Sequence, residues 1–329
     1  NASLSGGGEF HISWRSISGD RNAHHSAFRE WHRKISSSAE SGFVERILRL
    51  RPYEVPDTMK AEETSWRVDS FLFSERIKNR HSQWWNKGKD ISAKFLSRKM
   101  NGREYVEELG FKVPDLFWAG KDVLQIPKLK NLPSRVVIKP EKGWSAKNVW
   151  CLIEGENILD GIVYNDQMIQ KQLVQDEFLQ KQKLFYMVEE FLLPEQDNGN
   201  PIPCDYKFYC FGSKIALIHV VNRKSTKSHL NVHHCFDENF RLIKHKVYNS
   251  LAVPDDEIIL PDCFPEMVEA VEKIGTTLGI FMRIDMYATA KGAVFGEFTP
   301  TPHGGKGFSE WADKYLGSFW KGEEGCEDG

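Results

Sequence analysis

The stretch that most constrains this chain is residues 282–299, because its pattern predicts a β-hairpin. Apolar and polar residues alternate on both sides of a short Lys-Gly turn, which is typical of two antiparallel strands. If residues 290–292 form a three-residue loop, counting outward from that loop places Asp285 directly opposite Glu297. The hairpin therefore brings two carboxylates face to face.

Two facing carboxylates need a positive partner between them. Like charges directly opposite on one sheet face destabilise the strand pair, and an unpaired carboxylate in a dry cleft carries a large cost. Oxygen-only ligands suit a hard cation such as Mg²⁺, which often shares carboxylates with substrate phosphates. On the same face, Arg283 is expected opposite Thr299. The pattern predicts a surface for metal and nucleotide, with a solvated hairpin edge in another register as the alternative.

Length and composition indicate a globular protein with room for two or three domains. The chain has 329 residues, of which 40% are hydrophobic and 12% aromatic, and this is ample for packed cores. No apolar run approaches the roughly 18 residues that a membrane span needs. The six cysteines lack the paired spacing of a disulfide framework or a zinc site, so we expect a reducing, cytoplasmic setting.

The N-terminal part differs from the rest in charge and pattern. Residues 1–9 resemble a tag remnant with a flexible linker, and residues 10–95 show mostly helical patches that hold half of the tryptophans. Residues 10–100 carry 18 Lys and Arg against 11 Asp and Glu, whereas residues 101–329 carry 26 against 34. We expect a basic helical cap with buried tryptophans. Two alternatives stay open: this segment recruits an acidic saccharide or, less favoured, single-stranded nucleic acid.

After this segment the pattern changes to helix, strand, loop and strand. We expect one amphipathic helix and three strands, over residues 97–110, 116–118, 136–140 and 149–153. The loop before the last strand holds Gly143, Ser145 and two lysines. Such a loop can present backbone N–H groups and cations to phosphate oxygens, although a solvated turn is the simpler interpretation of it in isolation.

The second half of the chain predicts two further strand groups and one clear helix. We expect a strand over 187–193, a hairpin over 205–221 and a helix over 262–278. An acidic, Asn/Gly-rich turn follows the first strand, as is typical of a hinge between domains. On the hairpin, Asp205 and Lys207 share one face because strand side chains alternate with a period of two.

The histidines and cysteines of this sequence do not predict another kind of metal or catalytic site. His233, His234 and Cys235 invite a metal site, but adjacent residues on a strand point to opposite faces and no second ligand pair lies near in the sequence. The sequence shows no Ser-His-Asp or Cys-His arrangement, so these histidines and His219 are interpreted as ordinary polar residues.

Several short motifs occur in an order that resembles the ATP-grasp superfamily. They are Lys99, Lys139-Pro-Glu-Lys-Gly-Trp-Ser, Glu189-Glu190-Phe191-Leu192, Asp205-Tyr-Lys207, Arg283-Ile-Asp285 and Glu297-Phe-Thr299. Within the superfamily, the runs Asp-Tyr-Lys-Phe-Tyr-Cys-Phe and Phe-Gly-Glu-Phe-Thr-Pro-Thr-Pro-His-Gly-Gly look most like the teichuronopeptide-biosynthesis-type ATP-grasp proteins. The resemblance covers about residues 95–315.

The resemblance implies an α+β fold of the ATP-grasp type, in which two α+β subdomains clasp ATP. The implied subdomains are residues 96–187 (central or lid subdomain) and 188–322 (C-terminal subdomain with the metal site). The resemblance leaves the first 95 residues unexplained, so residues 1–9 (tag remnant), the mostly helical N-terminal segment 10–95 and the disordered tail 323–329 are predicted from pattern and composition alone.

The resemblance also implies a role for each matching residue. The residues implied in ATP binding are Lys99 and Lys139 for the phosphates, Gly143, Ser145 and Ala146 for the lid loop, Glu189, Phe191 and Leu192 for adenine, and Glu195 or Asp197 for ribose. Lys207 would bind the γ-phosphate and act in catalysis with Arg283. Asp285, Glu297 and Thr299 would hold Mg²⁺. Thr299 stands where many family members have Asn, which implies weaker coordination of a second ion.

The implied activity is that of an ATP-dependent carboxylate–amine ligase. Phosphoryl transfer is catalysed chiefly by positioning and by neutralising negative charge, which these acids and cations supply. A substrate carboxylate would attack the γ-phosphorus, and an amine would capture the acyl phosphate. The implied substrate is a sugar acid, an amino acid or a peptide in polymer or secondary-metabolite biosynthesis. A phosphotransferase acting on a hydroxyl and a non-catalytic nucleotide-binding scaffold are the alternatives.

Overall fold

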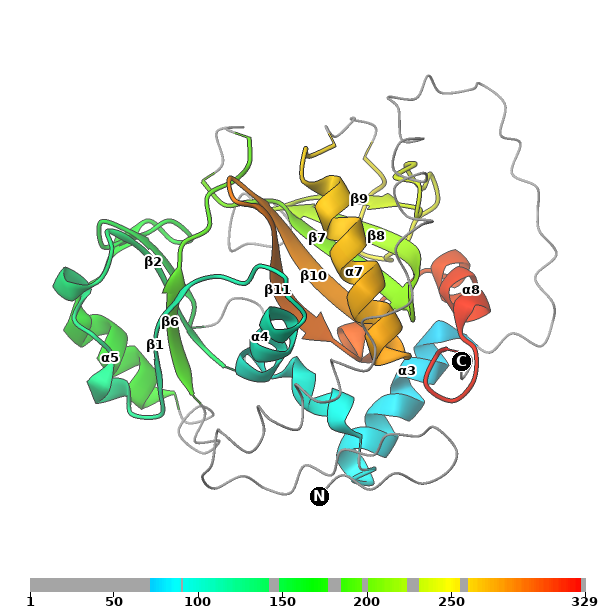
Figure 1. The fold of residues 1–329 in the computed structure, drawn as a ribbon, viewed down its shortest axis with the longest axis horizontal. Coiled ribbons are helices and arrows are strands. Elements are labelled where there is room, and N and C mark those ends of the chain that lie inside the picture. Colours follow the sequence, from blue (N-terminus) through cyan, green and yellow to red (C-terminus); the bar gives the residue numbers. More distant parts are fainter. Residues whose placement is uncertain are drawn as a thin grey trace.

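The computed structural model describes most of the chain from residue 72 onward (Figure 1). The described ranges are 72–89, 91–141, 148–176, 185–196, 201–223, 231–254 and 260–326. The predicted tag remnant and most of the predicted helical segment 10–95 lie outside them, as do the last three residues of the predicted tail. Every helix in the described part of the chain is too short or too polar to span a bilayer.

The first of two antiparallel sheets has the strand order β1-β6-β2-β3-β4-β5. Its strands are β1 (Leu116–Gly120), β2 (Arg135–Pro140), β3 (Trp150–Ile153), β4 (Glu156–Asn157), β5 (Ile162–Val163) and β6 (Tyr186–Glu190). Helix α5 (Asp166–Gln175) packs Ile169 and Leu173 against the buried side of these strands. The strands predicted at 116–118, 136–140 and 149–153 are therefore confirmed, each within a residue or two of its observed end.

The second sheet has the order β11-β10-β7-β8-β9 and carries the predicted hairpins. Its strands are β7 (Asp205–Phe211), β8 (Lys214–Asn222), β9 (Val232–Phe236), β10 (Phe281–Thr289) and β11 (Gly292–Thr299). Both β7 and β10 are buried along almost their whole length, because helices cover parts of both faces. Both strands place apolar side chains on each of their faces, such as Phe208 and Tyr209 of β7, and this pattern reflects the double covering.

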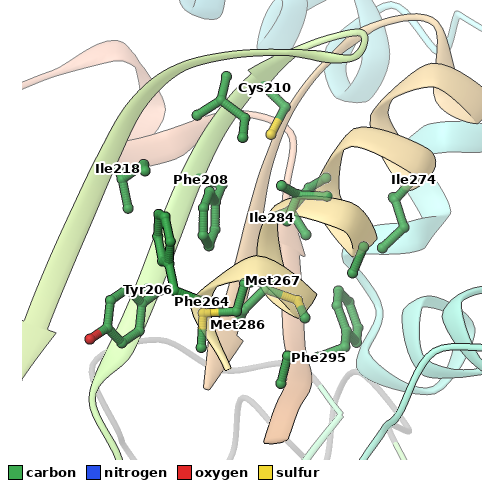
Figure 2. Packing of buried hydrophobic residues seen from close by; sticks show 14 of the residues in the cluster. Tyr206, Phe208, Cys210, Ile218, Phe264, Met267, Ile274, Ile284, Met286 and Phe295 are labelled. Carbon is green, nitrogen blue, oxygen red and sulfur yellow. The ribbon is translucent and has the colours of Figure 1, made fainter. Parts of the chain in front are cut away.

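One face of the second sheet packs against α7 (Phe264–Leu278). Pro265 lies in the first turn of this helix, where its missing N–H is not needed, and Gly279 follows the helix in the left-handed conformation at φ 60°. The apolar stripe of α7, which includes Met267 and Ile274, meets Phe208 and Ile284 from the strands (Figure 2). Helix α4 (Lys99–Glu108) adds Tyr105 and Val106 to the same core beside β11.

The opposite face of the second sheet packs against α3 (Phe73–His81) and α8 (Glu310–Phe319). Phe73 lies among Tyr209, Phe211 and Phe281 of the sheet, with ring centroids 5.1 to 6.3 Å apart. Buried Arg80 holds this layer together, because it donates to the carbonyl oxygens of Phe281, Pro300 and Glu324. Helix α3 was predicted within segment 10–95, yet it packs directly on the second sheet.

The β10–β11 hairpin has the predicted residue pairs at Asp285 and Arg283, but its turn differs from the predicted one. Thr289 pairs with Gly292, so the turn has two residues rather than the three that we predicted. Gly296 is an extra residue in β11, because Met286 pairs with Phe295 while Asp285 pairs with Glu297. This β-bulge shifts the register by one residue and restores the predicted Asp285–Glu297 and Arg283–Thr299 pairs.

Close contact between α7 and the β7–β8 turn makes Gly275 a sensitive position. A Cβ atom added at buried Gly275 would lie 2.0 Å from the carbonyl oxygen of Gly212, so helix or turn must move. Gly275→Ala should lower the free energy of unfolding by about 2 kcal/mol. Chemical denaturation checks this, with exposed Thr276→Ala on the same helix as the control. Equal stability of wild type and Gly275→Ala would contradict the packing described.

Candidate active site

Charged side chains gather on the face of the second sheet that packs against α3 and α8. They lie at one end of this face, and the two helices cover its other end. Strand pairing places Glu297, Asp285, Lys207 and His219 side by side across β11, β10, β7 and β8. On β7, the same face changes from aromatic at Tyr209 and Phe211 to charged at Lys207 and Asp205. Period-two alternation therefore leads from the hydrophobic layer straight into a polar site.

Asp285 is the most heavily bonded acid of the site. Its side chain is buried, and Arg283 binds both carboxylate oxygens at 2.7 Å, in the two-pronged geometry that suits a guanidinium. Lys207 Nζ contacts Asp285 Oδ2 at 2.5 Å. Two cations thus compensate one buried carboxylate.

Asp205 lies on the other side of Lys207 and was missing from our predicted site. Lys207 Nζ is 2.7 Å from Asp205 Oδ2, and Arg223 binds the same oxygen at 2.9 Å. Burial alone would raise the pKa of Asp205, but Lys207 and Arg223 lower it well below its ordinary value. The shared face of Asp205 and Lys207 was visible in the sequence, whereas the approach of Arg223 from the end of β8 was not.

Glu297 is the acid that solvent reaches most easily. Its side chain is 37% exposed, with Arg283 at 3.4 Å and Lys99 of α4 at 3.5 Å from its carboxylate oxygens. Burial favours the neutral form, but Lys99, Lys207 and Arg283 together lower the pKa of Glu297 to about 2. Arg283 contacts both facing carboxylates, so the like-charge conflict predicted for this hairpin is relieved by a side chain of the protein itself.

The described side chains of the site carry more positive than negative charge. The acids are Asp205, Asp285 and Glu297, and the cations are Lys99, Lys207, Arg223 and Arg283. An excess of one positive charge among partly buried side chains attracts anions. His219 and His303 lie in this field, and burial together with neighbouring cations lowers the pKa of His219 well below its ordinary value and that of His303 to about 4. Both imidazoles are therefore neutral at pH 7.

The residues predicted around the adenine ring lie at the end of the first sheet. Lys139 of β2 forms an ion pair with Glu189 of β6, and Phe191 and Leu192 follow that strand as buried residues. The carboxylate of Glu195 accepts from the backbone N–H groups of Asp262 and Cys263, at 2.7 and 2.8 Å.

The Glu195 contacts cap the region just before α7, so both carboxylate oxygens of this predicted ribose ligand are already in use. The other predicted ribose ligand and the lid loop cannot be placed, because Asp197, Gly143, Ser145 and Ala146 lie outside the described residues.

Comparison of the sequence with protein families decides the identity of the fold. Residues 75–321 match the model of the TupA-like ATP-grasp family. The chain belongs to this family. The two antiparallel sheets with their helices agree with the predicted α+β fold of the ATP-grasp type, and the predicted teichuronopeptide-type resemblance is confirmed. No curated protein matches the sequence.

Several solved structures are similar to this ATP-grasp protein. The ATP-grasp ligase PsnB, complexed with a phosphomimetic variant of its minimal precursor, Mg and ADP, is 11% identical, with a TM-score of 0.38 over 69% of this chain and 59% of that chain. D-alanine–D-alanine ligase from Bacillus anthracis, complexed with ATP, is 14% identical, with a TM-score of 0.39 over 63% and 56%.

The VanG D-Ala:D-Ser ligase from Enterococcus faecalis is 15% identical, with a TM-score of 0.39 over 68% of this chain and 56% of that chain. This ATP-grasp protein thus spans 56% to 59% of the length of these three solved chains. At these TM-scores the similarities add no argument to the family match.

Three cations near Glu297 make its ionisation a test of the site geometry. Its folded-state pKa of about 2 lies below the ordinary value of about 4.3 for an unfolded glutamate. Ionised Glu297 therefore stabilises the fold above the unfolded pKa, and this contribution is lost as the pH falls through the folded pKa. The stability advantage of wild type over Glu297→Gln should shrink steadily between about pH 5 and pH 2.

Carbon-13 NMR of the Glu297 carboxyl group measures the same property directly. Lys99→Met should move its titration midpoint upward, because one of the cations that lower the pKa is removed. A midpoint near 4.3 in wild type, unchanged in Lys99→Met, would refute the geometry of this site.

Proposed function

We propose that this ATP-grasp protein is an ATP-dependent carboxylate–amine ligase that forms an amide through an acyl phosphate. The observation that carries the proposal is the cluster around Lys207, where three acids and four cations converge from β7, β10, β11, α4 and the residue that follows β8. Such a site offers acids for a metal and cations for phosphate oxygens at once. Transfer of a phosphoryl group to a carboxylate needs this combination, because negative charge accumulates on both reactants.

The donor set fits Mg²⁺. Asp285 and Glu297 face each other with oxygen donors only, and the contacts of Glu297 at 3.4 and 3.5 Å leave its carboxylate accessible. Within the described ranges, no three His, Cys, Asp or Glu side chains gather to hold a metal by themselves, so phosphate oxygens and Thr299 would complete the coordination. The bound ion would neutralise the phosphate oxygens during transfer.

The side chains of the protein supply the remaining positive charge. Lys207 and Arg283 are buried, and both form ion pairs with Asp285, so their charged groups are held in fixed positions. In the proposal Lys207 binds the γ-phosphate and Arg283 binds the transferred phosphoryl group or the substrate carboxylate. Lys99 and Lys139 bind other phosphate oxygens, and Glu189, Phe191 and Leu192 meet the adenine ring.

The second step is capture of the acyl phosphate by an amine. The amine nitrogen attacks the acyl carbon, the C–N bond forms, and the bond to the phosphate oxygen breaks to release phosphate. The proposed acid is a sugar acid, an amino acid or a peptide in polymer or secondary-metabolite biosynthesis, in the cytoplasm. The phosphotransferase and the non-catalytic scaffold use the same nucleotide site, so product analysis has to separate them.

Glu297→Ala tests the metal assignment. Release of ADP from Mg·ATP, measured with pools of amino acids and sugar acids, should fall at least about a hundredfold. Because Glu297 is partly exposed and loosely paired, the variant should fold, whereas Asp285→Ala would also leave Arg283 and Lys207 without their buried partner. Glu310→Ala removes an exposed acid on α8 and serves as the control. Full activity in Glu297→Ala would remove this residue from the metal site.

Hydroxylamine distinguishes the ligase from the phosphotransferase. An acyl phosphate is electrophilic, so hydroxylamine added with Mg·ATP and the right acid should yield a hydroxamate, detected by its iron complex or by mass. A stable phosphorylated product without hydroxamate identifies a phosphotransferase instead. Binding of Mg·ATP without any ADP formation, across all acids and hydroxyl compounds tried, identifies the scaffold.

A further inference from the structure

The turn of the β10–β11 hairpin touches the segment that leaves the first sheet. Pro194 forms an isolated β-bridge with Thr289, and the N–H of Ala290 donates to the carbonyl of Leu193 at 3.0 Å. The N–H of Glu195 donates to the carbonyl of Ala288 at 3.3 Å. The connection between β6 and the second sheet is therefore fastened to the hairpin that carries Asp285 and Glu297.

Side chains reinforce this contact on the other side of the turn. Lys291 Nζ lies 2.6 Å from Glu190 Oε1 and 3.3 Å from Asp115 Oδ2, while the other oxygen of Glu190 accepts from the N–H of Asp115 at 3.2 Å. Lys112 Nζ donates to the carbonyl of Lys291 at 2.6 Å. We name Lys112, Asp115, Glu190 and Lys291 the hinge clasp.

The hinge clasp joins the two halves of the proposed ATP site. Glu190 lies between Glu189 and Phe191 in the chain, so it belongs to the segment proposed to meet adenine. Lys291 lies in the turn of the hairpin whose strands carry the proposed metal ligands and Arg283. The Lys291–Glu190 ion pair is therefore the side-chain contact that connects the base end of the site to its phosphate end, beside the backbone hydrogen bonds of residues 193–195.

We infer that Lys291, through Glu190, is a positioning residue that sets the spacing between the adenine-binding segment and the metal-binding hairpin. This inference rests on the proposed function, because it concerns the same ATP site. Lys291 touches neither half of the ligand in this scheme. It acts by holding residues 190–192 at a fixed distance from Asp285 and Glu297.

The physical reason is that ATP must engage both halves of the site simultaneously. When two contacts belong to one ligand, the second forms at an effective concentration that depends on how well the spacing of the protein matches that of the ligand. An exposed ion pair adds little to overall stability. Loss of the clasp should therefore appear in the binding of the whole nucleotide and not in the binding of its separate parts.

The experiment compares three probes by isothermal titration calorimetry: adenosine, Mg·tripolyphosphate and a non-hydrolysable Mg·ATP analogue. Lys291→Ala should weaken the Mg·ATP analogue about tenfold, within the usual range for coupling between linked sites. The affinities for adenosine and for Mg·tripolyphosphate should stay within about twofold of wild type, because neither probe bridges the hinge.

Three further variants show whether charge and geometry carry the effect. Glu190→Gln should weaken the analogue to a similar degree, and the exchange of charges in Lys291→Glu with Glu190→Lys should restore part of the affinity. Lys314→Ala is the matched control, because Lys314 also pairs with a glutamate at 2.6 Å and is 45% exposed, against 53% for Lys291. This control should bind all three probes like wild type.

Two results would overturn the inference. In one, Lys291→Ala binds the analogue as tightly as wild type. In the other, it weakens the analogue and both fragments equally, which signals general damage to the site. Failure of the proposed ATP site gives a different result, since wild type itself would then bind neither the analogue nor Mg·tripolyphosphate. Failure of the ligase activity alone leaves the binding of all three probes unchanged and appears only in the hydroxamate assay.

Discussion

The site depends on Lys207, which lies between two buried aspartates on neighbouring strands. Its ammonium group is 2.7 Å from Asp205 and 2.5 Å from Asp285. Without it, the two carboxylates would lose a partner that they share, and removing one member of a buried ion pair costs about 3–5 kcal/mol. Lys207, which is proposed to bind the γ-phosphate, therefore also stabilises the contact between β7 and β10.

One face of the second sheet carries both a packed aromatic layer and the charged side chains of the site. Towards α3 and α8 this face is filled with aromatic rings, and Arg80 fixes the start of β10 through the carbonyl of Phe281. A few residues further along the same strands, the face carries Arg283, Asp285 and Lys207. Because the strands are clamped by α7 on one side and by α3 and α8 on the other, these side chains extend from a backbone with little freedom to move.

Much of the charged site could be predicted, because side chains along a strand alternate with a period of two. The parts that could not be predicted depend on contacts between residues far apart in the sequence. The Asp285–Glu297 pair was predicted with a wrong turn length, and the bulge at Gly296 corrected the register. A glycine within a strand is a known signal for a bulge, but its presence alone does not say which way the register shifts. Arg223 reaches Asp205 only because β8 pairs with β7, and side-chain reach of this kind leaves no trace in a local pattern.

The ion pairs of the site bear on how the proposed substrates would bind. Asp285 already holds Arg283 and Lys207, and Glu297 has Arg283 and Lys99 nearby. A magnesium ion with a nucleotide would bring both the cation that the carboxylates need and the anion that the lysines and the arginine need. Binding then exchanges one set of partners for another instead of burying uncompensated charge. Since desolvation is the main cost of a buried ion, a site that is already paired avoids most of that cost when the nucleotide binds.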